Sequence, residues 1–285
     1  ITITINIGSI FTPFSSSENI LISDAFGLDF LWFMQNFVVF VFGSLFLTLL
    51  LLDFTMLRNQ PAPPEHQKII LMEIMNPNLV IINQKQFLLN SIYFGAVIVA
   101  FIFVPDAYLI ALLGAILMSI FNGEKVQSSL EKVDWQVIFF FISLFLIIGC
   151  MQINGTFQYI SEWLRSITSD DVLVAAIVIL ILTSLLSGFL ANSPTAVVLI
   201  TLILDIYGPN PPNAILIAFL LGINLGGNLL PQGAACDVMT LNIATKNKVE
   251  GFTYKTLLKR GGAFALFHNL LCIIYIALYV WVTGG

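Results

Sequence analysis

The sequence predicts an all-α membrane protein whose helices are interrupted at polar positions. The 285-residue chain is 58% hydrophobic and only 9% charged, with a mean hydropathy of +0.97. Soluble globular domains carry about 25% charged residues, so this composition excludes an ordinary soluble domain. Several apolar runs are long enough to cross a bilayer as helices. The net charge of −5 argues against a nucleic-acid-binding protein.

The first part of the chain predicts a helix end, a polar break and one complete span. Ile1–Ile7 reads as the end of a membrane helix and is followed by the polar break Gly8–Asn19. Phe30–Phe54 is apolar and long enough to span. Arg58–Gln86 is polar and rich in proline, which predicts a linker.

The middle of the chain contains three more apolar runs and one amphipathic segment. The runs predict spans at Phe87–Val104, Ala107–Phe121 and Trp135–Met151. A charged loop, Asn122–Asp134, precedes the last of them. Gly155–Ser169 is amphipathic, with apolar residues against Glu162 and Arg165, and we expect it to lie along the membrane interface.

Two apolar arms, Val172–Leu186 and Val197–Ile206, follow this segment. Each arm is marginal in length for a spanning helix, and a polar stretch separates them. We therefore predict a re-entrant hairpin over residues 172–206, with its tip at Asn192–Thr195.

The stretch Asn224–Thr240 interrupts an apolar segment at a depth where a membrane helix is expected to be continuous. Its poor helix formers are Gly226, Gly227, Pro231 and Gly233. Its polar side chains, which are costly in hydrocarbon, belong to Asn224, Asn228, Gln232 and Asp237. The combination predicts a discontinuous helix over 212–245, and an ordinary loop between two short helices is the alternative. A basic amphipathic segment, Lys246–Arg260, and a last span at 262–283 complete the chain.

The placement of charge predicts the orientation. All lysine and arginine residues except Arg165 lie in three segments, 55–86, 122–134 and 246–260. If these segments face the cytoplasm, the alternation fits the predicted spans only when the hairpin enters and leaves on the same side. The positive-inside rule thus supports the hairpin, places the C-terminus outside and suits a plasma (inner) membrane.

The two polar breaks share a pattern. Their common spacing pairs Asn6 with Asn224, Gly8 with Gly226, Pro13 with Pro231 and Asn19 with Asp237. Because the charge argument gives the copies opposite orientations, they predict an inverted repeat. In this organisation residues 1–54 end the first repeat, 55–86 form a linker and 87–285 form the second repeat.

Three motifs, taken in their order along the chain, resemble the ion transporter superfamily. They are Val133-Asp134-Trp135, the tip Asn192-Ser193-Pro194-Thr195, and the glycine-rich break Asn224–Gly233. The superfamily includes arsenite permeases, sodium/proton antiporters of the NhaD type, the melanosomal P protein and sodium-coupled dicarboxylate carriers. The resemblance covers essentially the whole chain. It implies a secondary transporter with elevator-like alternating access, and a homodimer.

The resemblance also implies that each half supplies a hairpin and an unwound helix, with substrate between the two hairpin tips. The chain starts at Ile1, without methionine, inside an apolar segment, so the first half begins at its unwound helix. We therefore expect a missing N-terminal half of the same protein, and no transport by the 285-residue chain alone.

Oxygen-bearing side chains at the tip and the second break are the first binding candidates. The side-chain groups of Asn192, Ser193 and Thr195, with backbone exposed by Pro194, could bind either Na⁺ or an oxyanion. The alternative is a purely structural role in which these residues cap the hairpin turn. Backbone carbonyls around Asn224–Asn228, which include those of Gly226 and Gly227, would complete a cation site in the break opened by Pro231 and Gly233. A Na⁺ ion is predicted at Asn192, Ser193, Thr195, Asn224 and Asn228.

Each break also has one carboxylate close to it, Asp237 in the second and Glu18 in the first. An acid beside a helix break is a candidate for coupling to Na⁺ or H⁺, unless it lies at the membrane surface. The hydroxyls of the first break are either solute ligands or loop solubilisers, and they belong to Thr12, Ser15, Ser16 and Ser17. The other binding candidates of this break are Asn6, Gly8, Pro13 and Asn19.

The substrate class stays open between anion and cation. No basic residue falls within a predicted membrane core, yet half-helix N-termini and hydroxyls bind anions without one. Ala191 stands where the NhaD-type pattern carries Asp, which disfavours the Na⁺/H⁺ antiporter and leaves an oxyacid such as arsenite, or a carboxylate. A passive channel and a membrane-embedded enzyme are the remaining alternatives. HExxH and GxSxG are absent from the sequence, so we expect a non-enzyme whose only cofactor is a coupling ion.

Overall fold

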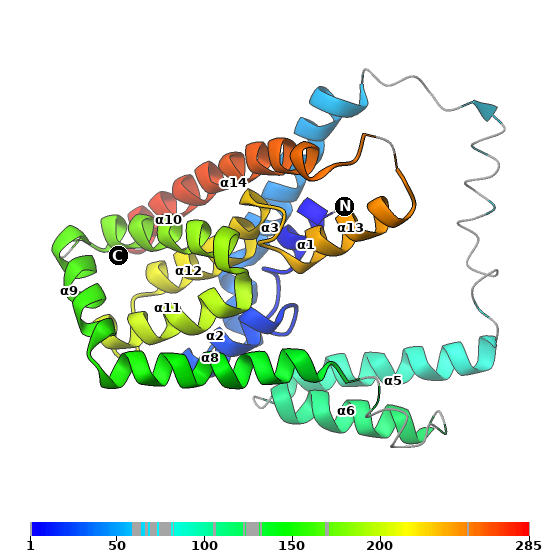
Figure 1. Cartoon of the computed structure of the whole chain (residues 1–285), viewed down its shortest axis with the longest axis horizontal. Coiled ribbons are helices and arrows are strands. Elements are labelled where there is room, and N and C mark those ends of the chain that lie inside the picture. The colour runs from blue at the N-terminus through cyan, green and yellow to red at the C-terminus, as the bar shows by residue number, and fades with distance from the viewer. Residues whose placement is uncertain are drawn as a thin grey trace. The chain divides into compact units, whose positions relative to one another are not determined.

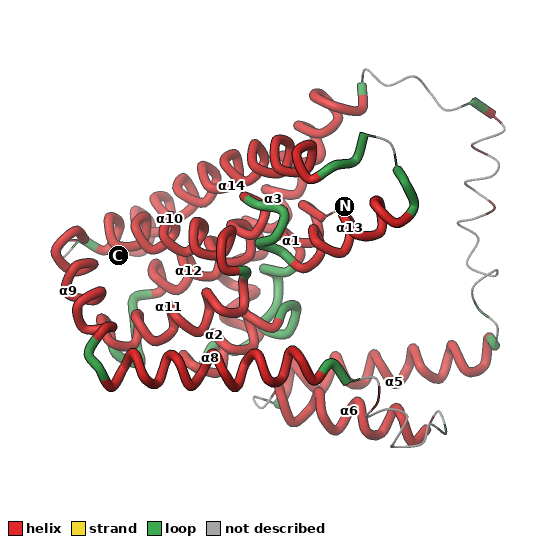
Figure 2. Tube along the Cα trace, in the orientation of Figure 1, coloured by secondary structure: helices red, strands yellow, loops and turns green. Residues whose placement is uncertain are grey.

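The computed structural model describes residues 2–58, 64–65, 68, 73, 81, 83–104, 107–121, 123, 131, 133–168, 171–249 and 251–284. Helices and the turns between them make up this described part (Figure 2). The described helices that are long and apolar enough to cross a bilayer are Phe30–Met56, Gln84–Phe103, Val172–Leu190 and Tyr254–Thr283. The chain is therefore an all-α membrane protein. Most of the predicted linker 55–86 and loop 122–134 lies outside the described residues.

The chain divides into two compact units, residues 48–133 and the remainder. The unit 48–133 contains helix α5 (Gln84–Phe103), which is long enough to span as predicted, and helix α6 (Ala107–Phe121), which is apolar but shorter than a full span. Tyr93 of α5 donates a hydrogen bond of 2.9 Å to the carbonyl of Gly114 in α6. Most of their large apolar side chains are exposed, as expected for helices that face lipid.

The larger unit begins with the first predicted break. Helix α1 (Thr2–Gly8) ends at the expected glycine, and helix α2 (Ser17–Phe26) starts within the predicted polar stretch. It starts there because the side chain of Ser16 accepts a hydrogen bond from the backbone N–H of Asn19 and caps the helix. Helix α3 (Phe30–Leu52) and a π-helical turn, η1 (Asp53–Leu57), form the predicted span.

Helix α8 (Trp135–Ile153) and helix α9 (Thr156–Thr168) meet at a bend of 73°. Helix α9 has the predicted amphipathic character. Its Phe157 and Leu164 are buried, whereas Tyr159 and Trp163 are exposed. An exposed aromatic stripe beside charged residues is typical of a helix at a membrane interface.

Helix α10 (Val172–Leu190) and helix α11 (Asn192–Tyr207) pack against each other as a helical hairpin at the predicted residues (Figure 1). Its re-entrant course in the membrane stays a prediction. Helix α10 continues past the predicted end of its arm at Leu186 and is long enough to span by itself. The only residue between the helices is Ala191, with φ 72° and ψ 163°. This backbone conformation is essentially confined to glycine, so the hairpin turn is strained.

The second predicted break is also present. Helix α12 (Asn213–Gly226) passes into a 3₁₀ turn, η3 (Gly227–Leu229), and the chain stays non-helical until helix α13 (Ala235–Lys246). The last helix, α14 (Tyr254–Thr283), begins before the predicted span at 262. Its cap at Thr253 draws Lys255–Arg260 into the helix, so the predicted basic segment is divided between α13 and α14.

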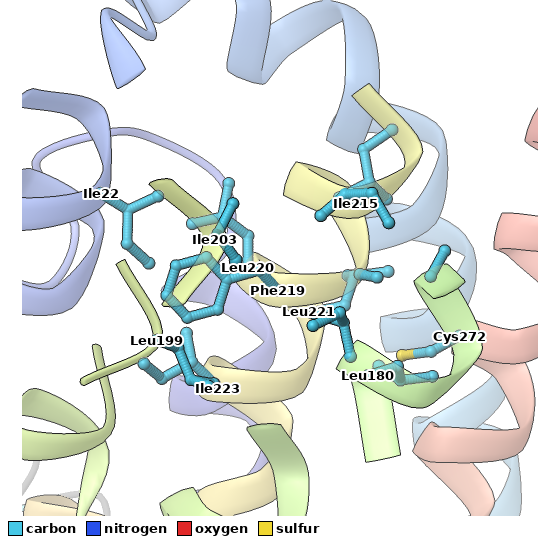
Figure 3. Packing of buried hydrophobic residues seen from close by; sticks show 14 of the residues in the cluster. Ile22, Leu180, Leu199, Ile203, Ile215, Phe219, Leu220, Leu221, Ile223 and Cys272 are labelled. Atoms are coloured by element: carbon cyan, nitrogen blue, oxygen red, sulfur yellow. The ribbon is translucent and has the colours of Figure 1, made fainter. Parts of the chain in front are cut away.

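Helix α12 is the centre of the larger unit, and all its residues from Ala214 to Gly226 are buried. It packs against α10, α11, α14 and α2. Phe219, Leu220 and Leu221 lie among apolar side chains of these neighbours (Figure 3). The approach of α10 is very close, because a Cβ atom on Gly226 would lie 2.4 Å from the Cα atom of Ser184. Only glycine is tolerated at such a distance.

Candidate functional site

The two helix breaks meet through the asparagine side chains that begin the sequence pattern. Asn6 of α1 donates a hydrogen bond of 2.7 Å from its Nδ2 atom to Oδ1 of Asn228 in η3. Asn224 of α12 donates from Nδ2 to Oδ1 of Asn19 in α2, at 2.9 Å. These carboxamides are nearly or fully buried, so each bond replaces water that the side chains have lost.

The first break is closed by its own polar groups. Asn19 donates from Nδ2 to the carbonyls of Ser9 and Thr12, at 2.7 and 2.9 Å. The Ser15 hydroxyl donates to the same two carbonyls. The Ser9 hydroxyl reaches the second break and donates to Oδ1 of Asn224 at 2.7 Å. Backbone carbonyls that leave the helical pattern are thus held by side chains, as required away from water.

The hairpin tip touches both breaks. The Ser193 hydroxyl donates to Oε1 of Glu18 at 2.8 Å, and its oxygen lies 3.3 Å from that of the Ser17 hydroxyl. Ser17 and Glu18 are in the first turn of α2. Asn192 lies against the second break, because a Cβ atom on Gly227 would be 2.8 Å from its Oδ1 atom. The Ser187 hydroxyl of α10 donates to the same Oδ1 atom and fixes the carboxamide.

Two predicted residues are directed elsewhere. Thr195 is fully buried, and its hydroxyl donates to the carbonyl of Ala191 within the hairpin turn. Asp237 is buried in the first turn of α13 but faces α1, where the Thr2 hydroxyl hydrogen-bonds to it. Neither side chain takes part in the contacts that join the tip to the breaks.

The remaining predicted residues shape the backbone. Pro231 and Gly233 are buried in the non-helical stretch, and a Cβ atom on Gly233 would lie 2.6 Å from the carbonyl oxygen of Gly227. Gly8 is exposed at the end of α1, while Pro13 and Pro194 are half-buried. Their contribution is to open or turn the chain, since they offer no polar side chain.

Sequence reasoning missed Ser9, Ser187 and Cys236. Ser187 lies within the polar stretch between the hairpin arms, so its position was a usable signal. The Cys236 thiol, 3.3 Å from Oδ1 of Asn6, follows no visible pattern. Among the described residues, no group of three or more His, Cys, Asp or Glu side chains could hold a metal ion.

The hydrogen-bond pattern favours a particular ligand chemistry. Each carboxamide oxygen of Asn6, Asn19, Asn192, Asn224 and Asn228 already accepts a hydrogen bond. By contrast, Nδ2 of Asn228 is a buried donor for which the described residues provide no acceptor. An unsatisfied buried donor costs about 1–3 kcal/mol, so this position favours a ligand that brings an acceptor oxygen.

Comparison with known proteins agrees with this architecture. A family model described as "citrate transporter" matches residues 1–222 and, in an overlapping match, residues 146–284. An uncharacterized transporter of Mycobacterium tuberculosis (strain H37Rv) is 24% identical over 98% of this chain and 66% of its own length. Another uncharacterized transporter of that strain is 29% identical over 48% of this chain and 33% of its own length.

The P protein of Sus scrofa is 27% identical over 64% of this chain and 23% of its own length. This chain therefore spans 66% of the mycobacterial relative that it matches along almost its entire length. The resemblance to the ion transporter superfamily, which includes the P protein, is confirmed. Since the family model covers the chain from end to end, the chain belongs to the citrate transporter family.

Proposed function

We propose that the protein carrying this chain is a secondary active permease for a small carboxylate or oxyacid anion, coupled to Na⁺ or H⁺. One observation carries the proposal: two helix breaks and a hairpin tip meet in a buried cluster of carboxamides and hydroxyls. Broken membrane helices with polar groups at their ends are how secondary transporters build a solute site inside the bilayer.

The contacts of the two breaks correspond to each other, which supports the inverted repeat. Asn224 of the second break contacts Asn19 in the first turn of α2. Asn6, its counterpart in the first break, contacts Cys236 in the first turn of α13. Each break asparagine thus reaches the helix that follows the other break. Two such related halves are the usual basis of alternating access, and overlapping family matches suit a chain with related halves.

Hydrogen-bond chemistry favours an anion as the main solute. The unmatched Nδ2 donor of Asn228 can donate to an oxygen of the solute, whereas the single proton of the Ser193 hydroxyl is already donated to Glu18. A site made of carboxamides and hydroxyls binds a carboxylate by hydrogen bonds, without a buried cation. The family's name adds citrate to the carboxylates that deserve a test.

A Na⁺/H⁺ antiporter is the second candidate, and the buried carboxylates favour it. Glu18 is 8% exposed and Asp237 is 4% exposed. Each is therefore largely removed from water, where a bound cation offsets the cost of the buried negative charge. In the proposed permease these same carboxylates bind the coupling ion. The permease therefore differs from the antiporter in that an anion is transported together with the ion.

Transport in liposomes separates these candidates. The protein as encoded by its gene would be reconstituted, and uptake of labelled citrate, succinate and arsenite measured under imposed Na⁺ or pH gradients. We expect saturable accumulation of one anion against its gradient. Sodium efflux that drives proton uptake without any anion would support the antiporter instead.

Two variants sharpen the assay. Glu18→Gln keeps an oxygen that can accept from Ser193 but removes the charge, so gradient-driven accumulation should fall while anion exchange persists. Asp24→Asn, an exposed change on the same helix, is the matched control and should resemble the unmodified protein. Flux that does not saturate and only dissipates gradients would indicate a channel and overturn the proposal.

A further inference from the structure

A cavity of about 310 Å³ lies away from the helix breaks, at the base of the hairpin. Helices α9, α10 and α11 enclose it, with Arg165, Thr168, Asp171, Val172, Ala175, Ile206 and Tyr207 as its lining. This volume is at the lower end for small-molecule sites, and it suits a polar group of a few atoms better than a whole lipid.

Arg165 is the charge that the orientation argument does not explain. It is the only basic residue in the segments predicted to face outside, where lysine and arginine are disfavoured. Its Nη2 atom donates to the carbonyls of Asp205 and Ile206, at 3.1 and 2.7 Å, and so positions the side chain at the end of α11. A guanidinium has five N–H donors, and these two bonds leave donors for a further acceptor.

An opposite charge lines the same cavity without pairing with Arg165. One oxygen of Asp171 accepts from the backbone N–H groups of Leu173 and Val174 and caps α10. No ion pair joins Asp171 to Arg165 among the described residues, although both line the cavity. A cation and an anion held apart in one cavity match a ligand that carries both charges, which can meet each of them.

The surroundings indicate that such a ligand comes from the membrane. On α9, Tyr159, Trp163 and Ile167 form an exposed stripe with a spacing of four residues. This stripe is unfavourable in water and belongs at the level of lipid headgroups, so the neighbouring cavity lies at the same level. The Tyr207 hydroxyl, in the lining, adds a donor of the kind that binds phosphate.

We propose that this cavity binds the headgroup of a zwitterionic aminophospholipid, of which phosphatidylethanolamine is the common example. Arg165 and Tyr207 donate to the phosphate, and Asp171 accepts from the primary amine. The acyl chains extend from the open side of the cavity into the bilayer. The bound lipid joins the interfacial helix to the base of the hairpin.

Lipid binding to the purified protein, as encoded by its gene, tests this proposal by native mass spectrometry in detergent. Phosphatidylethanolamine is compared with phosphatidylglycerol, which lacks the amine, and with soluble phosphoethanolamine, which lacks the chains. The variants are Arg165→Gln and Asp171→Asn. Asparagine caps a helix as well as aspartate does, so the second variant removes the charge and keeps the fold. Glu162→Gln, on α9 but outside the cavity, is the control.

We expect phosphatidylethanolamine to bind best and each variant to weaken it by about tenfold or more, which corresponds to about 1.4 kcal/mol. Asp171→Asn should leave phosphatidylglycerol binding unchanged, whereas Arg165→Gln should weaken it, and Glu162→Gln should alter neither. Equal affinity of Arg165→Gln and the unmodified protein for phosphatidylethanolamine would overturn the proposal. If the protein binds phosphatidylglycerol more tightly than phosphatidylethanolamine, the role of Asp171 is overturned. If it binds phosphoethanolamine as tightly as the lipid, the ligand is a soluble molecule instead.

Discussion

The side chains of Asn19 and Asn224 are 205 positions apart in the chain, yet a hydrogen bond of 2.9 Å joins them. The same Asn224 side chain accepts from the Ser9 hydroxyl and donates to the carbonyl of Leu220. One carboxamide therefore holds together α2, the first break and its own helix. Its position lets it bridge the two helix breaks.

Replacing Asn224 by alanine should weaken both the fold and the site. The change leaves the Oδ1 atom of the fully buried Asn19 without this partner, which costs about 1–3 kcal/mol in the free energy of unfolding. Denaturation in mixed micelles measures the loss, and anion binding should weaken in parallel. Asn247→Ala, at an exposed residue whose side chain bonds to the carbonyl of Ile243 in its own helix, should change stability by less than about 0.5 kcal/mol. Equal stability of the two variants would contradict the prediction.

Asp237→Asn should remove ion coupling while preserving expression. Asparagine can keep a hydrogen bond with Thr2, but it cannot hold the charge that balances a bound cation. We expect the ratio of uptake with and without an ion gradient to fall towards one in proteoliposomes, at unchanged protein yield. Transport that stays fully gradient-dependent would remove Asp237 from the site.

Gly226→Ala should disrupt the packing of α12 on α10. The added Cβ atom would meet the backbone of Ser184 at 2.4 Å, and backbone cannot move aside as a flexible side chain does. Overpacking of this kind costs about 1–3 kcal/mol or more, which lowers the thermal unfolding midpoint in detergent. Gly43→Ala is the control, because nothing lies within 4 Å of its Cβ position and alanine favours a helix. An unfolding midpoint equal to that of the unmodified protein would contradict the prediction.

Ala191→Gly should raise stability. Alanine at φ 72° and ψ 163° costs about 1–3 kcal/mol, and glycine removes that strain at a smaller entropic cost of about 0.5–1 kcal/mol. The thermal unfolding midpoint should therefore rise. Ala234→Gly, at φ −114°, relieves no strain and should lower it. A lower midpoint for Ala191→Gly would show that the turn is not strained.

Local patterns predicted where the helices stop. A glycine or proline ends a helix within a few positions of itself, as around Gly8 and Gly226. A polar residue in an apolar run has a similarly local effect. The same holds for the amphipathic α9, whereas the start of α2 after its cap Ser16 falls inside the stretch predicted as a polar break. These features depend on backbone conformation and burial, which neighbouring residues largely determine.

The partners within the site could not be predicted in this way. The pairing of Asn6 with Asn228, or of Glu18 with Ser193, depends on how distant helices pack. Sequence spacing carries no information on which polar side chain lies opposite which. The positive φ of Ala191 was also hidden, because alanine is not the residue that this conformation favours.

The complete enclosure of α12 has a consequence for how the protein is made. With 14 residues it is shorter than the roughly 20 that a lone helix needs to cross a bilayer, and it ends in polar groups. Its neighbour α14 is synthesised after it. We therefore expect α12 to become stable in the membrane only after α14 has been synthesised and has packed against it.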